Sequence, residues 1–224
     1  MKMAQYSLSP CKTEDLQSLW ETVFGDSRSV TQAFFADAFF PDGCFYAEAD
    51  GKAVAALYLL PVNTGNLNGF YLYAAATLPA WRGQGIMGNL IREALTFAKG
   101  CSDFVYLCPA EDSLYAYYER FGFSQTLYAA CFENADTEEI VGAGAMYEYA
   151  SAQENCPHFM SSVYRYADRI GCRMYLKKGT EFADRVMYPV GRADAKYKKV
   201  PYGTAVLFNG SRLPADWFAF LTMN

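Results

Sequence analysis

The feature that most restricts the fold is a run of 29 residues without a charged side chain, residues 53–81. A membrane-spanning helix needs roughly 20 consecutive apolar residues, so the run is first considered as a span. Its centre, residues 61–69, is polar and rich in turn-forming residues. The flanking segments, residues 53–60 and 70–77, are short and contain aromatic and β-branched residues. The run therefore predicts two buried strands around a turn, and no membrane contact.

Composition excludes several classes of function. With 52% hydrophobic and 19% charged residues the chain can bury a sizeable core, and its net charge of −5 does not suggest a nucleic-acid binder. His158 is the single histidine, which excludes a His-based metal cluster or His-pair acid/base site. The seven cysteines contain no C-x-x-C pair, so no zinc or other metal site is predicted. The odd cysteine count and the lack of a secretory leader predict reduced thiols and a cytoplasmic protein.

The order of predicted elements indicates an α/β (mixed α+β) fold. Helices are expected at residues 13–24, 29–40, 85–99 and 113–121, and strands at residues 44–48, 53–60, 70–77, 104–108 and 123–132. This order predicts a mixed sheet with helices on its faces, formed by residues 1–133. Residues 134–146 are expected to be a linker. Residues 147–224 are expected to be a small C-terminal α+β extension, with a helix at 159–170 and strands at 172–176, 185–190, 205–208 and 217–221.

The segment that carries chemistry is residues 77–88, Thr-Leu-Pro-Ala-Trp-Arg-Gly-Gln-Gly-Ile-Met-Gly. A buried strand ends there, a proline turn follows, and a glycine-rich loop leads directly into an amphipathic helix. Glycines let the backbone approach a ligand, and the first turn of a helix leaves its N–H groups unpaired. Arg82 adds a positive charge, so the loop predicts a cradle for a phosphate or pyrophosphate. The segment matches neither the P-loop pattern nor the dinucleotide-binding pattern.

A second motif stands at residues 118–123, Tyr-Glu-Arg-Phe-Gly-Phe, where a short helix stopped by glycine precedes a strand. With both segments the chain resembles the GCN5-related N-acetyltransferase (GNAT) superfamily. The acetyl-CoA motif of that superfamily, R/Q-x-x-G-x-G/A preceded by V-x-P-x-x, is similar to residues 77–87. Its Tyr-Glu-x-x-Gly-Phe signature is similar to residues 118–123. The resemblance covers residues 1–133 and implies an acetyltransferase domain with a mostly antiparallel twisted sheet.

The resemblance also implies a role for each matching residue. Backbone N–H groups from Gly83 to Gly88 would bind the CoA pyrophosphate, and the strand end would polarise the thioester carbonyl. Tyr118 would donate a proton to the departing thiolate, the alternative in a chain with 18 tyrosines being an ordinary core residue. The cofactor-binding residues implied in this way are Ala75, Ala76, Thr77, Arg82, Gly83, Gln84, Gly85, Ile86, Met87, Gly88 and Tyr118.

Two positions depart from the family pattern. Met87 stands where Gly or Ala is usual, and Glu111 stands where an asparagine often contacts the cofactor arm. Glu111 is therefore expected either to accept a hydrogen bond or to serve as a catalytic base. The other candidate bases are Glu48, Asp112 and the terminal carboxylate of Asn224, the last by similarity to the enhanced-intracellular-survival type of acetyltransferase.

The expected activity is direct transfer of an acetyl group from acetyl-CoA to a primary amine of a small molecule or peptide. No cysteine has an identifiable base partner, so an acyl-cysteine route is not predicted. The alternative is a catalytically silent acyl-CoA-binding or regulatory module. An aminoacyl transferase that contains the same fold twice is disfavoured because the tail is too short and shows no second glycine loop. Homodimerisation through the extension is left open. Acceptor recognition is expected from aromatic residues and the extension, the aromatics being Phe34, Phe35, Phe39, Phe40, Tyr71 and Tyr73.

Overall fold

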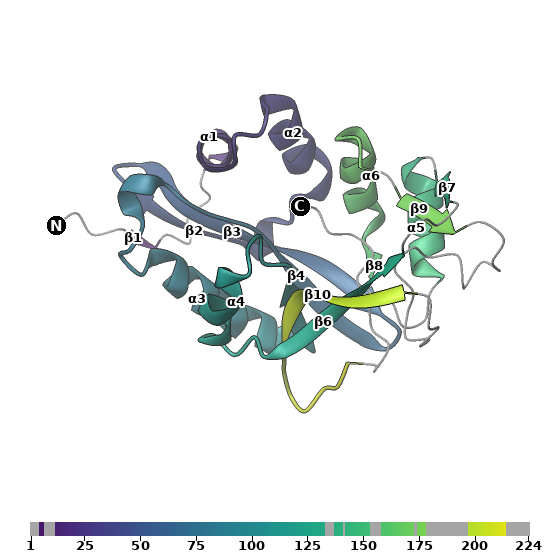
Figure 1. The fold of residues 1–224 in the computed structure, drawn as a ribbon. Coiled ribbons are helices and arrows are strands. Elements are labelled where there is room, and N and C mark those ends of the chain that lie inside the picture. Colours follow the sequence, from purple (N-terminus) through teal and green to yellow (C-terminus); the bar gives the residue numbers. More distant parts are fainter. Residues whose placement is uncertain are drawn as a thin grey trace.

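The computed structural model describes residues 5–6, 12–132, 137–140, 142–152, 158–172, 174–177 and 197–213. Its centre is an open sheet with the strand order β1-β2-β3-β4-β5-β10-β6, and β8 pairs with β3 beside this order (Figure 1). All neighbours in the sheet are antiparallel except β4 and β5. The strands are β1 Gln5–Tyr6, β2 Cys44–Ala49, β3 Lys52–Thr64, β4 Leu67–Thr77, β5 Phe104–Leu107, β6 Gln125–Phe132, β8 His158–Phe159 and β10 Tyr197–Leu207. The predicted α/β class with a mostly antiparallel sheet is confirmed.

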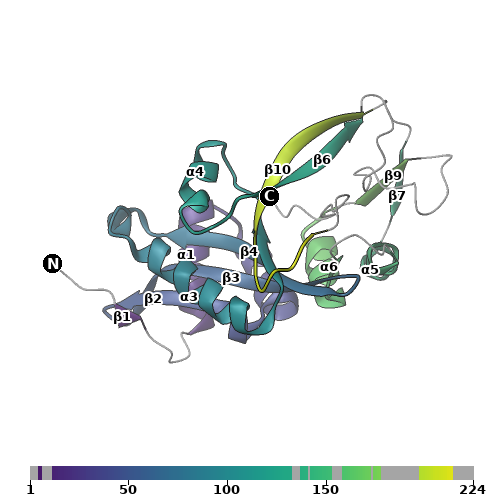
Figure 2. The same cartoon turned by 90° about the horizontal axis from the view of Figure 1, so that it is seen from below.

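Helices cover both faces of this sheet. They are α1 Thr13–Phe24, α2 Arg28–Ala33, α3 Ile86–Cys101, α4 Ser113–Glu119, α5 Ala143–Ser151 and α6 Ser161–Arg169. Helix α1 contacts β3 and β4 on one face, and α3 contacts β2 to β5 on the other (Figures 1 and 2). Two separate clusters of buried apolar side chains result, one on each face.

The uncharged run forms the two central strands of the sheet, as predicted. From Ala55 to Leu60, consecutive residues of β3 alternate between the clusters, with Leu57 on the α3 side and Tyr58 on the α1 side. A strand covered on both faces needs apolar residues at successive positions, which explains why the run has no charge. No helix in the described ranges is long and apolar enough to cross a membrane.

The predicted turn at residues 61–69 was too long. Strands β3 and β4 remain paired to Thr64 and Leu67, and the turn itself holds only residues 65–66. The polar residues that indicated a turn are accommodated because Asn63 and Asn68 face each other across the hairpin with exposed side chains. Strand pairing thus continues beyond the apolar part of the sequence.

The C-terminal part of the chain enters the main sheet. Strand β10 lies between β5 and β6, in a stretch where a strand was predicted only over residues 205–208. The expected linker instead contains β7 (Thr137–Ile140) and the start of α5, and β7 pairs with β9 (Met174–Lys177) in a second small sheet. The strands predicted at 185–190 and 217–221 lie outside the described residues. The division into 1–133 and 147–224 stays a prediction.

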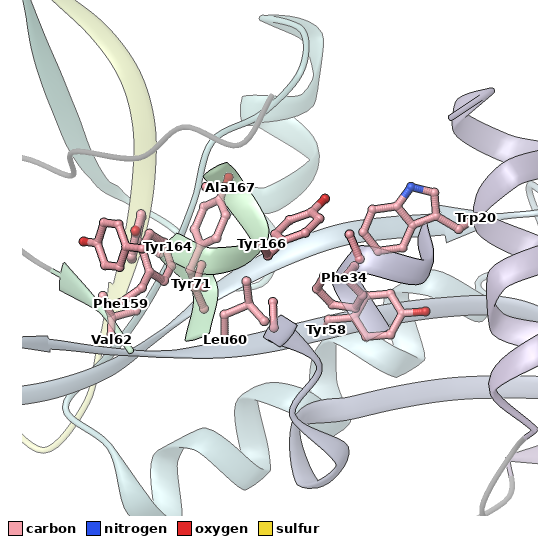
Figure 3. Close-up of a cluster of buried hydrophobic side chains, with 14 of the residues drawn as sticks. Trp20, Phe34, Tyr58, Leu60, Val62, Tyr71, Phe159, Tyr164, Tyr166 and Ala167 are labelled. Atoms are coloured by element: carbon pink, nitrogen blue, oxygen red, sulfur yellow. The ribbon is translucent and has the colours of Figure 1, made fainter. Parts of the chain in front are cut away.

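Helix α6 is fixed to the α1 side of the sheet by aromatic packing and by charge. Tyr166 of α6 lies 5.5 Å from Phe34 between ring centroids, inside the buried cluster (Figure 3). Two ion pairs add to this packing: Arg165 Nε lies 3.8 Å from Asp37 Oδ1, and Arg169 Nη1 lies 3.1 Å from Asp37 Oδ2. Residues distant in the sequence therefore form one continuous core on this face.

Gly69 marks the tightest packing between β4 and β5. It lies opposite Phe104 in the parallel pair, and a Cβ at position 69 would overlap the buried Phe104 ring. We expect Gly69→Ala to lower the free energy of unfolding by about 1–3 kcal/mol, measured by urea denaturation. Gly100→Ala is the control, because a Cβ there meets nothing within 4 Å. Equal stability of the two variants would contradict this packing.

Candidate active site

The site forms where two neighbouring strands separate. Strands β4 and β5 pair in parallel only over 69–71 and 104–106. Beyond this, β4 continues to Thr77 while β5 ends at Leu107. Ala74 has a φ of 47°, and the β3–β4 register shifts beside it, which marks a bulge in β4. In the described part of the chain, no strand pairs with this far half of β4 on the β5 side.

A cavity of about 490 Å³ occupies this opening. Its volume falls within the range of small-molecule sites. Most of its lining is apolar or aromatic, and Asp26 is the one charged side chain among the described lining residues. The lining residues are Trp20, Phe24, Asp26, Tyr71, Leu72, Tyr73, Ala74, Ala75, Leu107, Cys108, Ala110, Leu114 and Tyr118.

The glycine-rich loop begins where β4 ends and leads into α3. Arg82 Nε donates a hydrogen bond to the carbonyl oxygen of Thr77 at 3.1 Å, which ties the loop to the strand. Gly83 and Gly85 have φ values of 75° and 78°, and a Cβ at either meets nothing within 4 Å. Gly85 precedes α3 and provides no side-chain cap, so the first N–H groups of the helix are left for another acceptor.

Met87 and Gly88, in the first turn of α3, have packing roles. A Cβ at Gly88 would lie 3.3 Å from the Phe121 ring, so glycine allows α3 to approach the end of α4. Met87 is half-buried and packs against the core on the α3 side. The departure of residues 87–88 from the family pattern is therefore compatible with an open loop.

Tyr118 reaches the cavity from α4. Burial raises the pKa of its hydroxyl to about 12, and neighbouring Tyr117 adds to that shift. The Tyr118 ring packs edge-on against Tyr117 and Phe123, at centroid distances of 5.3 Å and 5.8 Å. The phenol is thus fixed in position and protonated at neutral pH.

The three candidate bases in the described part of the chain lie outside the cavity lining. Glu111 is exposed, accepts a hydrogen bond from Ser113 Oγ at 3.3 Å, and does not line the cavity. Asp112 is also exposed and precedes α4. Glu48 lies in β2, paired with Ala53, outside the cavity lining. Asn224 lies outside the described residues.

The aromatic residues expected at the acceptor site divide into two groups. Tyr71 and Tyr73 line the cavity. Phe34, Phe35 and Phe39 instead pack in the core on the α1 side, and Phe40 packs on the α3 side. The physical reason is that residues 34–38 form a π-helical turn that packs against α6, and the Phe34 ring contacts Tyr58 and Tyr73 of the sheet and is completely buried.

The cavity residues that were not predicted from the sequence include Trp20, Phe24 and Asp26. The periodic stripe of α1 indicated only a core for the first two. Gly25, with a φ of 76°, ends α1 and turns the chain, and Trp20 Nε1 then donates a hydrogen bond to Asp26 Oδ2 at 2.7 Å. An acid directly after a helix-ending glycine was the signal available.

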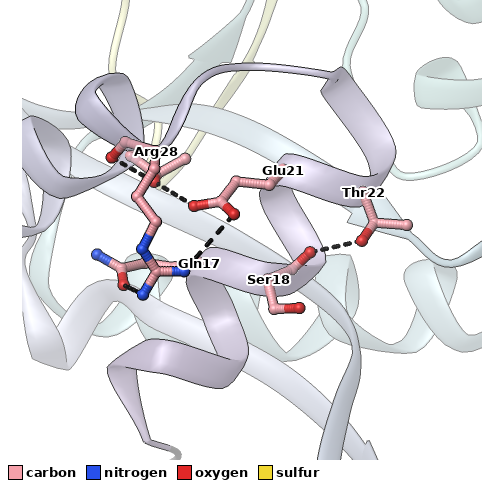
Figure 4. Close-up of polar contacts among 6 residues, drawn as sticks. Gln17, Ser18, Glu21, Thr22 and Arg28 are labelled. Atoms are coloured by element: carbon pink, nitrogen blue, oxygen red, sulfur yellow. Dashed lines mark hydrogen bonds and ion pairs between the residues drawn. The ribbon is translucent and has the colours of Figure 1, made fainter.

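The turn between α1 and α2 is held by a polar cluster (Figure 4). Arg28 lies 3.6 Å from Glu21 and donates to Gln17 at 3.4 Å. Thr31 donates to Glu21 at 2.9 Å. These contacts join the first turns of α2 to α1, and so they fix the segment that carries Asp26.

Helix α6 supports the cavity wall. The hydroxyls of Tyr73 and Tyr166 lie 3.2 Å apart and share a hydrogen bond. Burial raises the pKa of Tyr166 to about 12 and also raises that of Tyr73, and in both cases the Asp26 charge adds to the shift. Asp26 therefore acts electrostatically on a pair of hydroxyls that joins β4 to α6.

Comparison with known proteins adds a family. The model of the acetyltransferase (GNAT) family matches residues 9–123. No curated protein matches the sequence.

Several solved structures have a similar fold. A probable N-acyltransferase from Enterococcus faecalis V583, also described as a conserved protein of unknown function, superposes with a TM-score of 0.63 at 12% identity, over 92% of this chain and 73% of that one. A GCN5-related N-acetyltransferase from Anabaena variabilis gives 0.58 at 17% identity, over 78% and 51%. Eis1 from Mycobacterium abscessus gives 0.58 at 11% identity, over 78% and 50%. At these identities the likeness is one of fold.

Proposed function

The chain belongs to the GNAT acetyltransferase family, and from this premise we propose that it transfers an acetyl group from acetyl-CoA directly to a primary amine. The observation that carries the proposal is one continuous arrangement: an uncapped helix start, an open strand edge and a cavity containing Tyr118. Each part suits a different portion of a long thioester donor. Together they leave the remaining cavity for an amine.

The glycine loop is proposed to bind the donor's pyrophosphate. The N–H groups from Gly83 to Gly88 supply the donors, and the open space beside Gly83 and Gly85 leaves room for a ligand close to the backbone. Arg82 is exposed beside them and adds positive charge. Gln84, Ile86 and Met87 contribute through their backbone.

The open edge of β4 is proposed to hold the pantetheine arm. Backbone groups of Ala75, Ala76 and Thr77 are available there because β5 has already separated from β4. The bulge at Ala74 changes the direction of the neighbouring amides, and a backbone N–H at this point would orient and polarise the thioester carbonyl. Ala75 also lines the cavity, which places this edge beside the acceptor space.

Tyr118 is proposed as the general acid. A neutral amine attacks the acetyl carbonyl, the N–C bond forms and the C–S bond breaks, and the departing sulfur takes the proton of the Tyr118 hydroxyl. Tyr118 recovers a proton from the acetylated nitrogen through water, so the transfer is balanced. Glu111 follows the cavity residue Ala110 and is proposed to relay that proton, taking it from the nitrogen by way of water and passing it on to Tyr118.

Cys108 offers the obvious competing route, because its thiol lines the cavity. Burial raises the pKa of this thiol to about 12, although a hydrogen bond with Tyr71 partly offsets the shift. The nucleophilic form of cysteine is the thiolate, which is scarce at neutral pH for such a group. This supports direct transfer over an acyl-cysteine intermediate.

The test is amine-dependent release of free thiol from acetyl-CoA by the purified protein. We expect release with at least some members of a panel containing aliphatic monoamines, diamines and a lysine peptide. CoA binding by calorimetry without thiol release from any amine would instead favour an acyl-CoA-binding or regulatory module.

A further inference from the structure

The turn after α1 places a carboxylate in the wall of the cavity. Gly25 adopts the left-handed conformation, and its N–H bonds the Glu21 carbonyl oxygen, so the chain reverses at the end of the helix. Asp26 then accepts the 2.7 Å hydrogen bond from the Trp20 indole. Trp20 is 3% exposed, so this donor is held by the core, while Asp26 itself is exposed at the turn.

The Asp26 carboxylate is exposed in the cavity lining and is therefore accessible to a cation. Within the described residues no Lys, Arg or His forms an ion pair with Asp26, and no other charged side chain lines the cavity. Trp20, Phe24 and Tyr73 line the same cavity, and the Trp20 ring centroid lies 5.9 Å from that of Phe24 and 5.4 Å from that of Tyr73. Aromatic faces also attract cations, so carboxylate and rings favour the same ligand.

A cation bound at Asp26 would not be the nitrogen that reacts. A carboxylate favours the charged form of a neighbouring amine, and an ammonium has no lone pair for attack on a thioester. Tyr118, where the reaction is proposed, comes from α4, while Asp26 follows α1, which packs on the opposite face of the sheet from α3 and α4 (Figure 1). Asp26 and Tyr118 thus approach the cavity from different sides.

We propose that Asp26 binds a second, positively charged amino group of the acceptor, so that this acetyltransferase selects diamines or polyamines over monoamines. The proposal rests on the proposed function, because it assigns the end of the acceptor remote from the reacting nitrogen. The aromatic walls then cover the apolar chain that links the two nitrogens. Asp26 is a specificity-determining residue and takes no part in bond making.

Matched amines test this directly. In 1-aminopentane a methyl group replaces one ammonium of 1,4-diaminobutane, and 1-aminoheptane is related to 1,6-diaminohexane in the same way. We expect the diamine of at least one pair to have a KM about tenfold lower than its monoamine in the thiol-release assay. Asp26→Asn should abolish that difference and leave KM for acetyl-CoA unchanged. The amide oxygen of the substituted side chain can still accept the Trp20 hydrogen bond, so the variant removes charge and keeps the turn.

Asp42→Asn is the control, since it removes an equal charge from an exposed site outside the cavity. Equal KM values for diamine and monoamine in both pairs, or an undiminished diamine preference in Asp26→Asn, would overturn the proposal.

If no amine gives thiol, the proposed function fails, and a binding measurement then decides the role of Asp26. The ¹⁵N-indole NMR signal of Trp20 should shift at a diamine concentration about tenfold lower than the monoamine concentration needed for the same shift, and Asp26→Asn should remove this difference. Identical titrations with diamine and monoamine would refute the proposal.

Discussion

Tyr118→Phe is expected to lower kcat for acetyl transfer by about 10²–10⁴-fold, the range typical of a positioned general acid, with little change in KM for acetyl-CoA. The substitution removes the hydroxyl alone. The ring contacts with Tyr117 and Phe123 remain, so the helix and the cavity wall keep their packing. Thiol release under saturating acetyl-CoA and diamine measures the effect.

Tyr117→Phe provides the matched control on the same helix. Tyr117 does not line the cavity, and the Arg120 guanidinium lies over its ring at 4.7 Å, a contact that phenylalanine preserves. This variant should retain near-wild-type kcat. An equal loss in both variants would indicate damage to α4 rather than loss of an acid, and full activity of Tyr118→Phe would remove Tyr118 from the mechanism.

The raised pKa of Tyr118 adds a pH signature to the same prediction. Burial disfavours the phenolate, so the hydroxyl titrates near pH 12 instead of 10 in the folded protein. The donor form therefore persists below that value, and kcat should show no descending limb from Tyr118 between pH 8 and about 10.5. The folded state also binds this proton more tightly than the unfolded chain, so the associated stability is present below pH 10 and is lost between about pH 10 and 12.

The parts of the site that could be predicted from the sequence lie within short contiguous segments. In residues 77–88 the strand end, the loop glycines and the helix start follow one another, and local backbone geometry decides what they form. The same holds for the helix that carries Tyr118. The uncharged run predicted central strands because a strand buried on both faces needs apolar residues at successive positions, and this pattern is visible in the sequence.

The parts that were missed depend on contacts between distant segments. Asp26 becomes a cavity residue only because α1 packs on β4 and the chain reverses at Gly25. Strand β10 pairs with β5 and β6, and the local sequence around Lys198 and Lys199 does not predict these pairing partners or their register. Phe34 was expected among the acceptor-site aromatics because periodicity cannot distinguish a face buried in the core from one that lines a cleft.

Gly85→Glu is expected to weaken CoA binding by about 10³-fold and so to abolish activity at ordinary acetyl-CoA concentrations. The carboxylate would stand at the uncapped start of α3, where the pyrophosphate is proposed to bind, and like charges about 4 Å apart near a protein surface repel by about 4 kcal/mol. No neighbouring atom lies within 4 Å of a Cβ at this position, so the core is not disturbed. Isothermal titration calorimetry with CoA measures the loss.

Two controls separate charge from backbone strain, because any L-residue at a φ of 78° costs roughly 1–2 kcal/mol. Gly85→Ala carries that strain without the carboxylate and should bind CoA within about tenfold of wild type. Gly210→Glu carries both at an identical φ of 78°, also in open space, beyond the C-terminal end of α3. It should lose a similar amount of stability and bind CoA normally. If Gly85→Glu binds CoA as tightly as Gly210→Glu does, the pyrophosphate lies elsewhere, and the loop is only a turn between β4 and α3.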